Sequence, residues 1–301
     1  MASAIDMTES NISLHQGEPL RTGLLRVVDT LTDSVTDDLA PPANNGEQDI
    51  HQVRTTIKRL RALLRLIRPA VDPVFFNREN SRLRTAAGLL SFARDTEVAR
   101  ETLRAVPVSN QTDQDAVQSV LSSFESGAHA PSHLTESVAE VKRRLEQTRR
   151  NFQRLKLKGP EREIVEAGLR AIYAQGRNRM KIAIAQGQDK AFHRWRIRAK
   201  NLYYELEFLE SVWPKGLHRV LSRLSQLQHQ IGLDHDVAVL RAWLKKSPEA
   251  FGGDKTAGRV IACLDRETRE LRQASVPLGQ KIWRQKPRRF AYKVARHWRK
   301  R

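Results

Sequence analysis

Six basic or ionisable side chains recur at helical spacing in residues 51–68. They lie 3, 4, 3, 4 and 3 residues apart, so an α-helix would place them along one face. At a rise of 1.5 Å per residue the row is about 25 Å long, enough to follow several successive phosphates of a chain. Charge-assisted hydrogen bonds to an extended polyanion are the chemistry that this arrangement favours. The row, called the basic stripe below, consists of His51, Arg54, Lys58, Arg61, Arg65 and Arg68.

No acidic residue lies between residues 50 and 68 to neutralise the basic stripe. Neighbouring like charges cost an isolated helix roughly 0.2–0.5 kcal/mol per pair, so the stripe does not serve helix stability. The apolar residues Val53, Ile57, Leu60, Leu64 and Ile67 form a seam displaced from it by one residue, about 100° around the helix. The stripe is therefore expected to flank the core and to line a groove where helices meet. The alternative for any single Lys or Arg is a solvated helix face.

An internal repeat gives the stripe a partner in the second half of the chain. Residues 51–68 align with residues 193–210 at an offset of 142, which places His193, Arg196 and Lys200 on the first three basic positions of the stripe. Tyr203 and Glu207 take the next two positions, and we expect Glu207 to pair with a base or to face water. Duplicated units tend to pack their equivalent faces together, so the repeat predicts two related helical units.

The repeat continues downstream at an offset of 141 residues. Arg78 and Arg82 align with Arg219 and Arg223, and Asp95 aligns with Asp236. We expect the two aspartates to cap helices or to pair with arginines rather than to perform catalysis.

Apolar periodicity predicts helices along most of the chain after a flexible segment at residues 1–20. The Pro41-Pro42 pair and the Asn44-Asn45-Gly46 turn predict a loop, and alternating strand patterns are hard to find. The sequence therefore predicts an all-α protein of two pseudo-symmetric helical bundles. The expected helices cover about residues 24–39, 49–68, 74–104, 114–125, 134–157, 161–186, 189–212, 215–230, 235–246, 255–273 and 278–299.

The charge balance also favours a polyanionic partner. The 301 residues carry a formal net charge of +19, although the first 50 hold nine acids against two arginines. Residues 281–301 hold ten Lys or Arg and no acid, interleaved with aromatic residues as in an amphipathic helix, which favours a polyanion-binding surface over a solvated tail. No apolar run is long enough to span a bilayer, the first residues lack the layout of a signal peptide, and Cys263 is the only cysteine. We expect a cytoplasmic protein that does not enter membranes.

Motifs for catalysis or for metal binding are missing. Gly252-Gly253-Asp254-Lys255-Thr256 has the wrong spacing for a nucleotide-binding loop, and there is no H-E-x-x-H pair. His129 and His133 lie four residues apart in a stretch that reads as a loop. The sequence predicts no cofactor, no metal and no enzymatic activity, and an enzyme acting on phosphate chains is the least favoured hypothesis.

Two segments resemble the motifs of the CHAD family, named for its conserved histidine α-helical domain. Residues 51–61, HQVRTTIKRLR, are similar to the family's H-x-x-R-x-x-x-[RK]-R-L-R segment. Residues 193–205, HRWRIRAKNLYYE, are similar to its second H-x-x-R-x-x-x-K-x-L-R-Y segment, with Tyr203 in place of the expected Arg. Arg94-Asp95 resembles the Arg-Asp that follows in the first half, and the helix from Tyr173 to Arg177 fits the family's Tyr-and-basic helix. The resemblance covers about residues 21–301, with halves at about 21–160 and 161–301.

The resemblance implies two helical bundles around a basic cavity that binds inorganic polyphosphate, in a binder rather than a hydrolase, at intracellular polyphosphate granules. The implied polyphosphate-binding residues are His51, Arg54, Lys58, Arg61, Arg65, Arg78, Arg82, Arg177, Lys181, His193, Arg196, Lys200, Tyr203, Arg219 and Arg223.

Nucleic acid is the competing partner, because a strongly basic helical protein also suits DNA or RNA. The best support for it is the segment from Leu217 to Trp243, where Gly232 separates two predicted helices. Competition between polyphosphate and nucleic acid would discriminate the two hypotheses. In either case an imidazole beside phosphate gains a proton more readily, so binding is expected to strengthen as the pH falls toward about 6.

Overall fold

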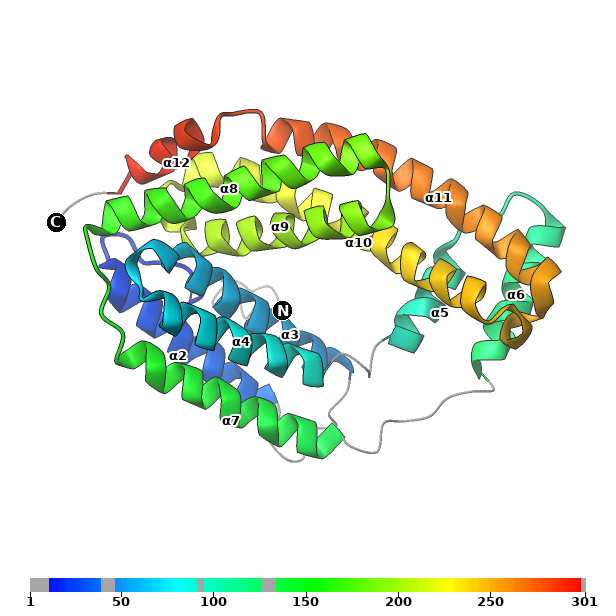
Figure 1. Ribbon diagram of the computed structural model, residues 1–301, viewed down its shortest axis with the longest axis horizontal. Coiled ribbons are helices and arrows are strands. Elements are labelled where there is room, and N and C mark those ends of the chain that lie inside the picture. Colours follow the sequence, from blue (N-terminus) through cyan, green and yellow to red (C-terminus); the bar gives the residue numbers. More distant parts are fainter. Residues whose placement is uncertain (1–10, 39–46, 91–94, 126–133, 299–301) are drawn as a thin grey trace, which may run out of the picture.

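A computed structural model describes residues 11–38, 47–90, 95–125 and 134–298 (Figure 1). Helices are the only regular elements in these ranges, which confirms the all-α prediction. The predicted loop at residues 41–46, His129 and His133 lie outside the described residues. Three short 3-10 segments, η1 (Arg68–Ala70), η3 (Glu210–Val212) and η4 (Pro248–Phe251), connect the longer helices. The α-helices are α2 (Leu20–Asp38), α3 (Glu47–Leu66), α4 (Pro73–Leu89), α5 (Asp95–Ala105), α6 (Gln111–Glu125), α7 (Leu134–Gln153), α8 (Glu161–Gln186), α9 (Asp189–Phe208), α10 (Pro214–Lys246), α11 (Gly253–Ile282) and α12 (Pro287–Ala295).

Three predicted helix boundaries are wrong. The helix expected over 74–104 is divided into α4 and α5, while the pair expected over 215–230 and 235–246 is the single helix α10. Gly232 costs a helix only about 1 kcal/mol relative to alanine, and the packing of α10 along α9 and α11 compensates for it. Similarly, α11 continues through Pro277 to Ile282, and the chain breaks at Trp283 before α12. Local breaker residues are thus overridden where a helix is packed on both sides of them.

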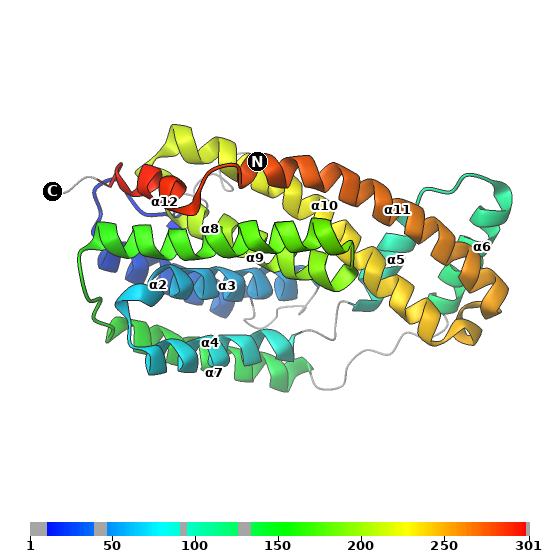
Figure 2. The ribbon, with the colours of Figure 1, turned by 45° about the horizontal axis from the view of Figure 1, so that its top comes forward.

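Two hydrophobic cores organise the molecule. The larger one lies among α2, α3, α4, α7, α8, α9 and α12 and the first part of α10. The smaller one lies among α5, α6 and the far parts of α10 and α11, with Leu103, Val120, Leu240 and Val260 fully buried. Figures 1 and 2 show this distal lobe at the end of the molecule opposite to α12. Because α5 and α6 pack on α10 and α11, residues from both halves of the sequence build the distal lobe.

The two helices that the repeat aligns, α3 and α9, lie against each other at the centre of the larger core. The apolar seam predicted for α3 is buried, with Val53, Ile57, Leu60 and Leu64 fully inaccessible. Trp195, Ala199, Leu202 and Leu206 are equally buried on α9. This packing turns the basic side chains of both helices toward the space between them.

The chain before α2 also packs on the larger core. Of the segment expected to be flexible, residues 11–20 are described, and the prediction does not hold for them. Ile12 and Leu14 are buried, the Leu14 N–H donates to the Phe208 carbonyl over 2.8 Å, and Arg26 pairs with Glu18. The apolar side chains of this segment explain the packing, although their short run carries no helical period. Residues 1–10 lie outside the described residues.

Candidate functional site

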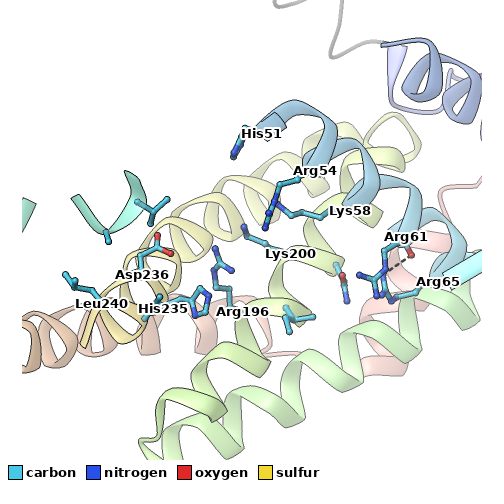
Figure 3. Close-up of a pocket in the computed structure, with 15 residues that line it drawn as sticks. His51, Arg54, Lys58, Arg61, Arg65, Arg196, Lys200, His235, Asp236 and Leu240 are labelled. Atoms are coloured by element: carbon cyan, nitrogen blue, oxygen red, sulfur yellow. Dashed lines mark hydrogen bonds between the residues drawn. The ribbon is translucent and has the colours of Figure 1, made fainter. Parts of the chain in front are cut away.

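A cavity of about 410 Å³ lies where α3, α5, α9 and α10 meet (Figure 3). Basic side chains enter it from α3 on one side and from α9 on the other, with His235 and Asp236 of α10 at its far end. Arg54 also donates from Nη1 to the Leu90 carbonyl over 2.6 Å, which holds its guanidinium in place. The basic residues that line this first cavity are His51, Arg54, Lys58, Arg61, Arg65, Arg196, Lys200 and His235.

A second cavity of about 560 Å³ lies next to the first one, between α3, α4, α8 and α9. Arg61 and Arg65 line both cavities, and Arg68, Arg179 and Arg198 add three further guanidinium groups. We call the two adjacent cavities together the basic groove. Every residue of the basic stripe of α3 therefore lines one or both of these cavities.

The second cavity depends on a close approach of α8 to the end of α3. A Cβ atom on Gly168 would lie only 2.1 Å from the Leu66 carbonyl oxygen, so no larger residue fits there without moving a backbone. Asn80 of α4 faces the same space and accepts from Arg61 Nε over 3.3 Å. The close packing of α8 on α3 and the hydrogen bond to α4 thus fix the position of this part of the second cavity.

The arginines of the groove crowd one another with little compensating charge. Burial, then Arg61, lowers the pKa of Arg65 to about 10, and burial with Arg84 and Arg198 lowers the pKa of Arg61. Burial and Arg179 lower the pKa of Arg198. An anion entering the groove would relieve this repulsion, so the groove favours a ligand with several negative charges.

Glu205 lies fully buried below the arginines of the second cavity. Neither of its carboxyl oxygens has a hydrogen-bond partner among the described residues. Burial raises the pKa of Glu205 well above its usual value, although Arg65 and Arg198 act in the opposite direction. Because a raised pKa favours the neutral carboxyl form, Glu205 compensates less of the arginine charge above it than an exposed carboxylate would.

Glu207 does not face the groove and pairs with a base, as one of the two sequence alternatives predicted. Its carboxylate accepts two hydrogen bonds from Arg59, over 2.8 and 3.0 Å. Both partners are partly buried, and Arg59 also lies 5.7 Å from the Tyr204 ring. This acidic residue is therefore satisfied outside the groove.

His193 lies beside the groove and contacts it through His235. The two Nδ1 atoms are 3.2 Å apart, and one ring donates to the other. Burial, followed by Arg196, lowers the pKa of His193. Burial, followed by Arg196, His193 and Lys200, lowers the pKa of His235 to about 4. Both imidazoles are therefore neutral near pH 7 while the groove holds no anion.

The structure brings together eight of the fifteen predicted site residues. Seven of them line the groove directly, and His193 stands behind His235. The seven lining residues are His51, Arg54, Lys58, Arg61, Arg65, Arg196 and Lys200.

Arg78 and Arg82 do not line the groove, which corrects the prediction. Both pair with Glu79, whose side chain is fully buried, and Glu79 also accepts from Asn151 of α7 over 2.8 Å. Asn80 lies two residues from each arginine, about 200° around α4, and it lines the groove together with Phe76. Helix rotation thus directs the two arginines toward α7.

Five other predicted residues also lie away from the groove. Arg179, two residues from both Arg177 and Lys181, takes the groove-facing position on α8. The groove-lining residues of α9 lie between Arg196 and Asn201, whereas Tyr203 lines a separate cavity with Glu210 and Leu221. Arg219 and Arg223 precede His235 on α10 by at least 12 residues, about 18 Å along the helix.

The two aspartates of the repeat were expected to cap helices or to pair with arginines, and the structure tests the cap for Asp236 alone. Asp236 lies inside α10, so it does not cap a helix, and it lines the first cavity. Asp95 begins α5, and its side chain lies outside the described residues.

Sequence reasoning missed several residues of the groove. Arg198 lies between the two recognised motif positions Arg196 and Lys200, but its angle on the helix placed it on another face. His235 lies next to Asp236 but belongs to neither histidine motif. The missed polar groups of the groove are Asn80, Gln175, Asn178, Arg179, Arg198, Asn201 and His235. Only the crossing of α4, α8 and α10 over α3 and α9 brings them there.

No three His, Cys, Asp or Glu side chains of the described ranges are placed to hold a metal ion. No described helix is long and apolar enough to cross a membrane.

The fold and the groove define an all-α protein whose two central helices share an arginine-lined cavity. The family model of the CHAD domain matches residues 34–245, and the chain therefore belongs to the CHAD domain family. Among solved structures it is similar to the crystal structure of the CHAD domain from the plant Ricinus communis, with a TM-score of 0.56 and 16% identity over 96% of both chains. At this identity the likeness shows a shared fold. No curated protein sequence matches the chain.

Proposed function

We propose that this protein binds inorganic polyphosphate in the basic groove. The observation that carries the proposal is that two adjacent cavities share Arg61 and Arg65, so that cations from α3, α8 and α9 follow one another, as a linear polyanion requires. Arginine suits this ligand, since its planar fork donates two parallel hydrogen bonds to phosphate oxygens. Membership in the CHAD family, together with the motifs that begin at His51 and His193, supports the same ligand.

The proposal is for binding without hydrolysis, at intracellular polyphosphate granules. A phosphate-release assay on purified protein with Mg²⁺ tests the first point, and release above the rate of a groove variant would make the protein an enzyme. Co-localisation of a fluorescent fusion with stained granules tests the second.

Duplex nucleic acid is the less favoured ligand for this groove. The helix-glycine-helix segment that supported it is one continuous helix, α10, with Leu217, Leu224 and Leu240 buried in the cores. Since both ends of this helix are packed, it presents no free recognition helix to a DNA groove. The pocketed shape of the basic groove suits a thin, flexible chain better than a duplex.

The affinity for long-chain polyphosphate, measured over a salt series with nucleic acid as competitor, tests the proposal. We expect the logarithm of affinity to fall with the logarithm of salt by about 0.7 for each phosphate contact. Duplex DNA at equal phosphate concentration is expected to leave polyphosphate bound. Displacement of polyphosphate by an equal charge of duplex DNA would instead make the groove a general polyanion surface.

Acidification is expected to strengthen polyphosphate binding through His193 and His235. The low pKa values of the empty groove keep both rings neutral, and phosphate raises these values, so the complex takes up protons. Affinity then rises as the pH falls through the raised pKa of the complex, and it levels off near the value of about 4 for free His235. Each unit by which phosphate raises a histidine pKa strengthens polyphosphate binding about tenfold once that histidine is protonated in the complex. This window lies lower than the sequence alone predicted, because burial holds the free pKa values down.

The pH dependence is measured as polyphosphate affinity from about pH 7.5 to about 4, the pKa of free His235, for the wild type and His235→Gln. A flat wild-type profile, or an equally steep one in the variant, would remove His235 from the ligand's surroundings. The stability of the ligand-free protein depends on pH in the opposite direction to the polyphosphate affinity. Since the folded pKa values lie below the unfolded value of about 6.5, the free protein loses stability as the pH falls below that value. A thermal unfolding series separates the two effects.

A further inference from the structure

A separate basic cavity lies on α12, outside the two cavities of the basic groove. It has a volume of about 920 Å³ and is lined by side chains of the α11–α12 connection and of α12 itself. None of its lining residues lines the groove. Figure 1 shows α12 at the end of the molecule opposite to the distal lobe. We call this surface the α12 face, and it consists of Arg284, Gln285, Lys286, Arg289, Tyr292, Lys293 and Arg296.

The α12 face carries positive charge without acidic neighbours in its own sequence. No Asp or Glu occurs from Lys281 to the end of the chain. Five of the seven lining residues are Lys or Arg, and in the part of the chain that the structure describes no carboxylate lines the cavity with them. The lining of this face is therefore positive or neutral, which favours an anionic ligand.

An aromatic ring stands exposed among these charges. Tyr292 is 51% exposed, whereas Trp283, Phe290 and Val294 of the same segment are buried. Phe290 stacks on Tyr173 of α8 with ring centroids 4.2 Å apart, which fixes the orientation of α12. The Arg162 guanidinium lies 5.7 Å from the Tyr292 ring. A rigid helix thus presents a phenol ring between cations.

We propose that the α12 face binds single-stranded nucleic acid, with a base stacked on Tyr292 and the neighbouring phosphates on Arg289 and the other cations of the cavity. Aromatic rings set in a basic groove are the means by which proteins hold single strands without reading their sequence. Polyphosphate has no base and gains nothing from an exposed ring. Paired bases of a duplex are stacked already and cannot reach it.

A membrane surface is a poorer partner for α12, although the helix is short, basic and amphipathic. Interfacial helices bury their apolar face in the lipid. The apolar face of α12 is already occupied, because Phe290, Ala291, Val294 and Ala295 are buried against the protein. The helix therefore offers only its polar face and Tyr292 to a partner.

Fluorescence anisotropy of an unstructured single-stranded RNA oligonucleotide with the full chain tests the proposal. Tyr292→Ala is expected to weaken RNA binding by roughly 5- to 150-fold, the range found for the loss of one base stack, and Tyr292→Phe is expected to retain it. Tyr292→Ala should leave polyphosphate affinity unchanged, because the ring lies outside the groove. An abasic oligonucleotide of the same length should bind the wild type about as weakly as RNA binds Tyr292→Ala.

Two neighbouring arginines provide a matched control for charge. Both Arg288 and Arg289 are exposed on α12, but only Arg289 lines the cavity. Arg289→Glu should therefore weaken RNA binding more than Arg288→Glu, although the net charge changes equally. The proposal is overturned if RNA and the abasic strand bind equally well, or if Tyr292→Ala binds RNA like the wild type. Neither result bears on polyphosphate binding in the groove, so the two proposals fail separately.

Discussion

Reversal of four charges in the basic groove is expected to abolish polyphosphate binding without unfolding the protein. The variant replaces Arg54, Lys58, Arg196 and Lys200 with Glu, two from α3 and two from α9, which face each other across the first cavity. A hydrogen bond to a charged group contributes about 1.5–3 kcal/mol, so the loss of four with reversed charge exceeds 1,000-fold in affinity. All four side chains are partly exposed and flank the core, so the apolar seam remains intact.

The measurement is polyphosphate affinity by titration, with circular dichroism and thermal unfolding to establish the fold. A milder variant, Arg54→Gln with Arg196→Gln, keeps measurable binding. Loss of two phosphate contacts should reduce its salt slope by about 1.4. A folded fourfold variant that binds like the wild type would show that the groove is not the site.

A matched charge control separates contact from net charge. It reverses four exposed basic residues away from the groove and makes the same change in total charge. Its affinity should fall only modestly at low salt and match the wild type at physiological salt, because exposed charges beyond about 8 Å are screened. These four residues are Arg170, Lys246, Lys255 and Arg269.

Arg82→Leu is expected to destabilise the protein and to leave polyphosphate affinity unchanged in the folded state. Glu79 has a fully buried side chain, and Arg82 is its closest cation. Removing one partner of a buried ion pair costs about 3–5 kcal/mol, because a charge stays buried without compensation. For a chain of 301 residues the midpoint of thermal unfolding should fall by roughly 5–8 °C. Asn151 and Thr148 still donate to the carboxylate but carry no charge.

Arg78→Leu is the matched control for this prediction. Arg78 lies on the same helix and approaches the same carboxylate, but its side chain is 57% exposed and its Nε is 3.4 Å from the oxygen. Its loss should therefore cost less than about 1 kcal/mol. Glu79→Gln added to Arg82→Leu should recover part of the lost stability, because it removes the buried charge. If Arg82→Leu left stability unchanged but lowered polyphosphate affinity, the prediction would be wrong and Arg82 would contact the ligand.

The sequence predicted α3 and α9 well because their signals are local. A period of 3.6 residues places His51, Arg54 and Lys58 on one face and Val53 and Ile57 on the next, whatever the rest of the chain does. The boundaries around Gly232 and Pro277 were wrong for the same reason. A breaker residue is a local signal, and it loses to burial of the helix on both sides.

The groove was predictable on α3 and only in part elsewhere. Repeat alignment transferred the basic positions to Arg196 and Lys200 correctly, since the two helices lie together. It failed for Arg78 and Arg82, because alignment does not report the rotation of a helix about its own axis. Two positions along a helix differ by about 200° around its axis, and this difference decides whether a side chain of α4 lines the groove or contacts the buried Glu79.

The sequence by itself determined the all-α class, the basic stripe of α3 with its buried seam, and the two histidine motifs, because composition, helical period and spacing are properties of a single segment. Only the tertiary structure decided which cations share a cavity. Arg179, Arg198 and His235 come from separate helices, and they meet Arg61 and Arg65 because apolar packing fixes the crossing and rotation of those helices. The same packing buries one face of α12 and leaves Tyr292 exposed among its cations.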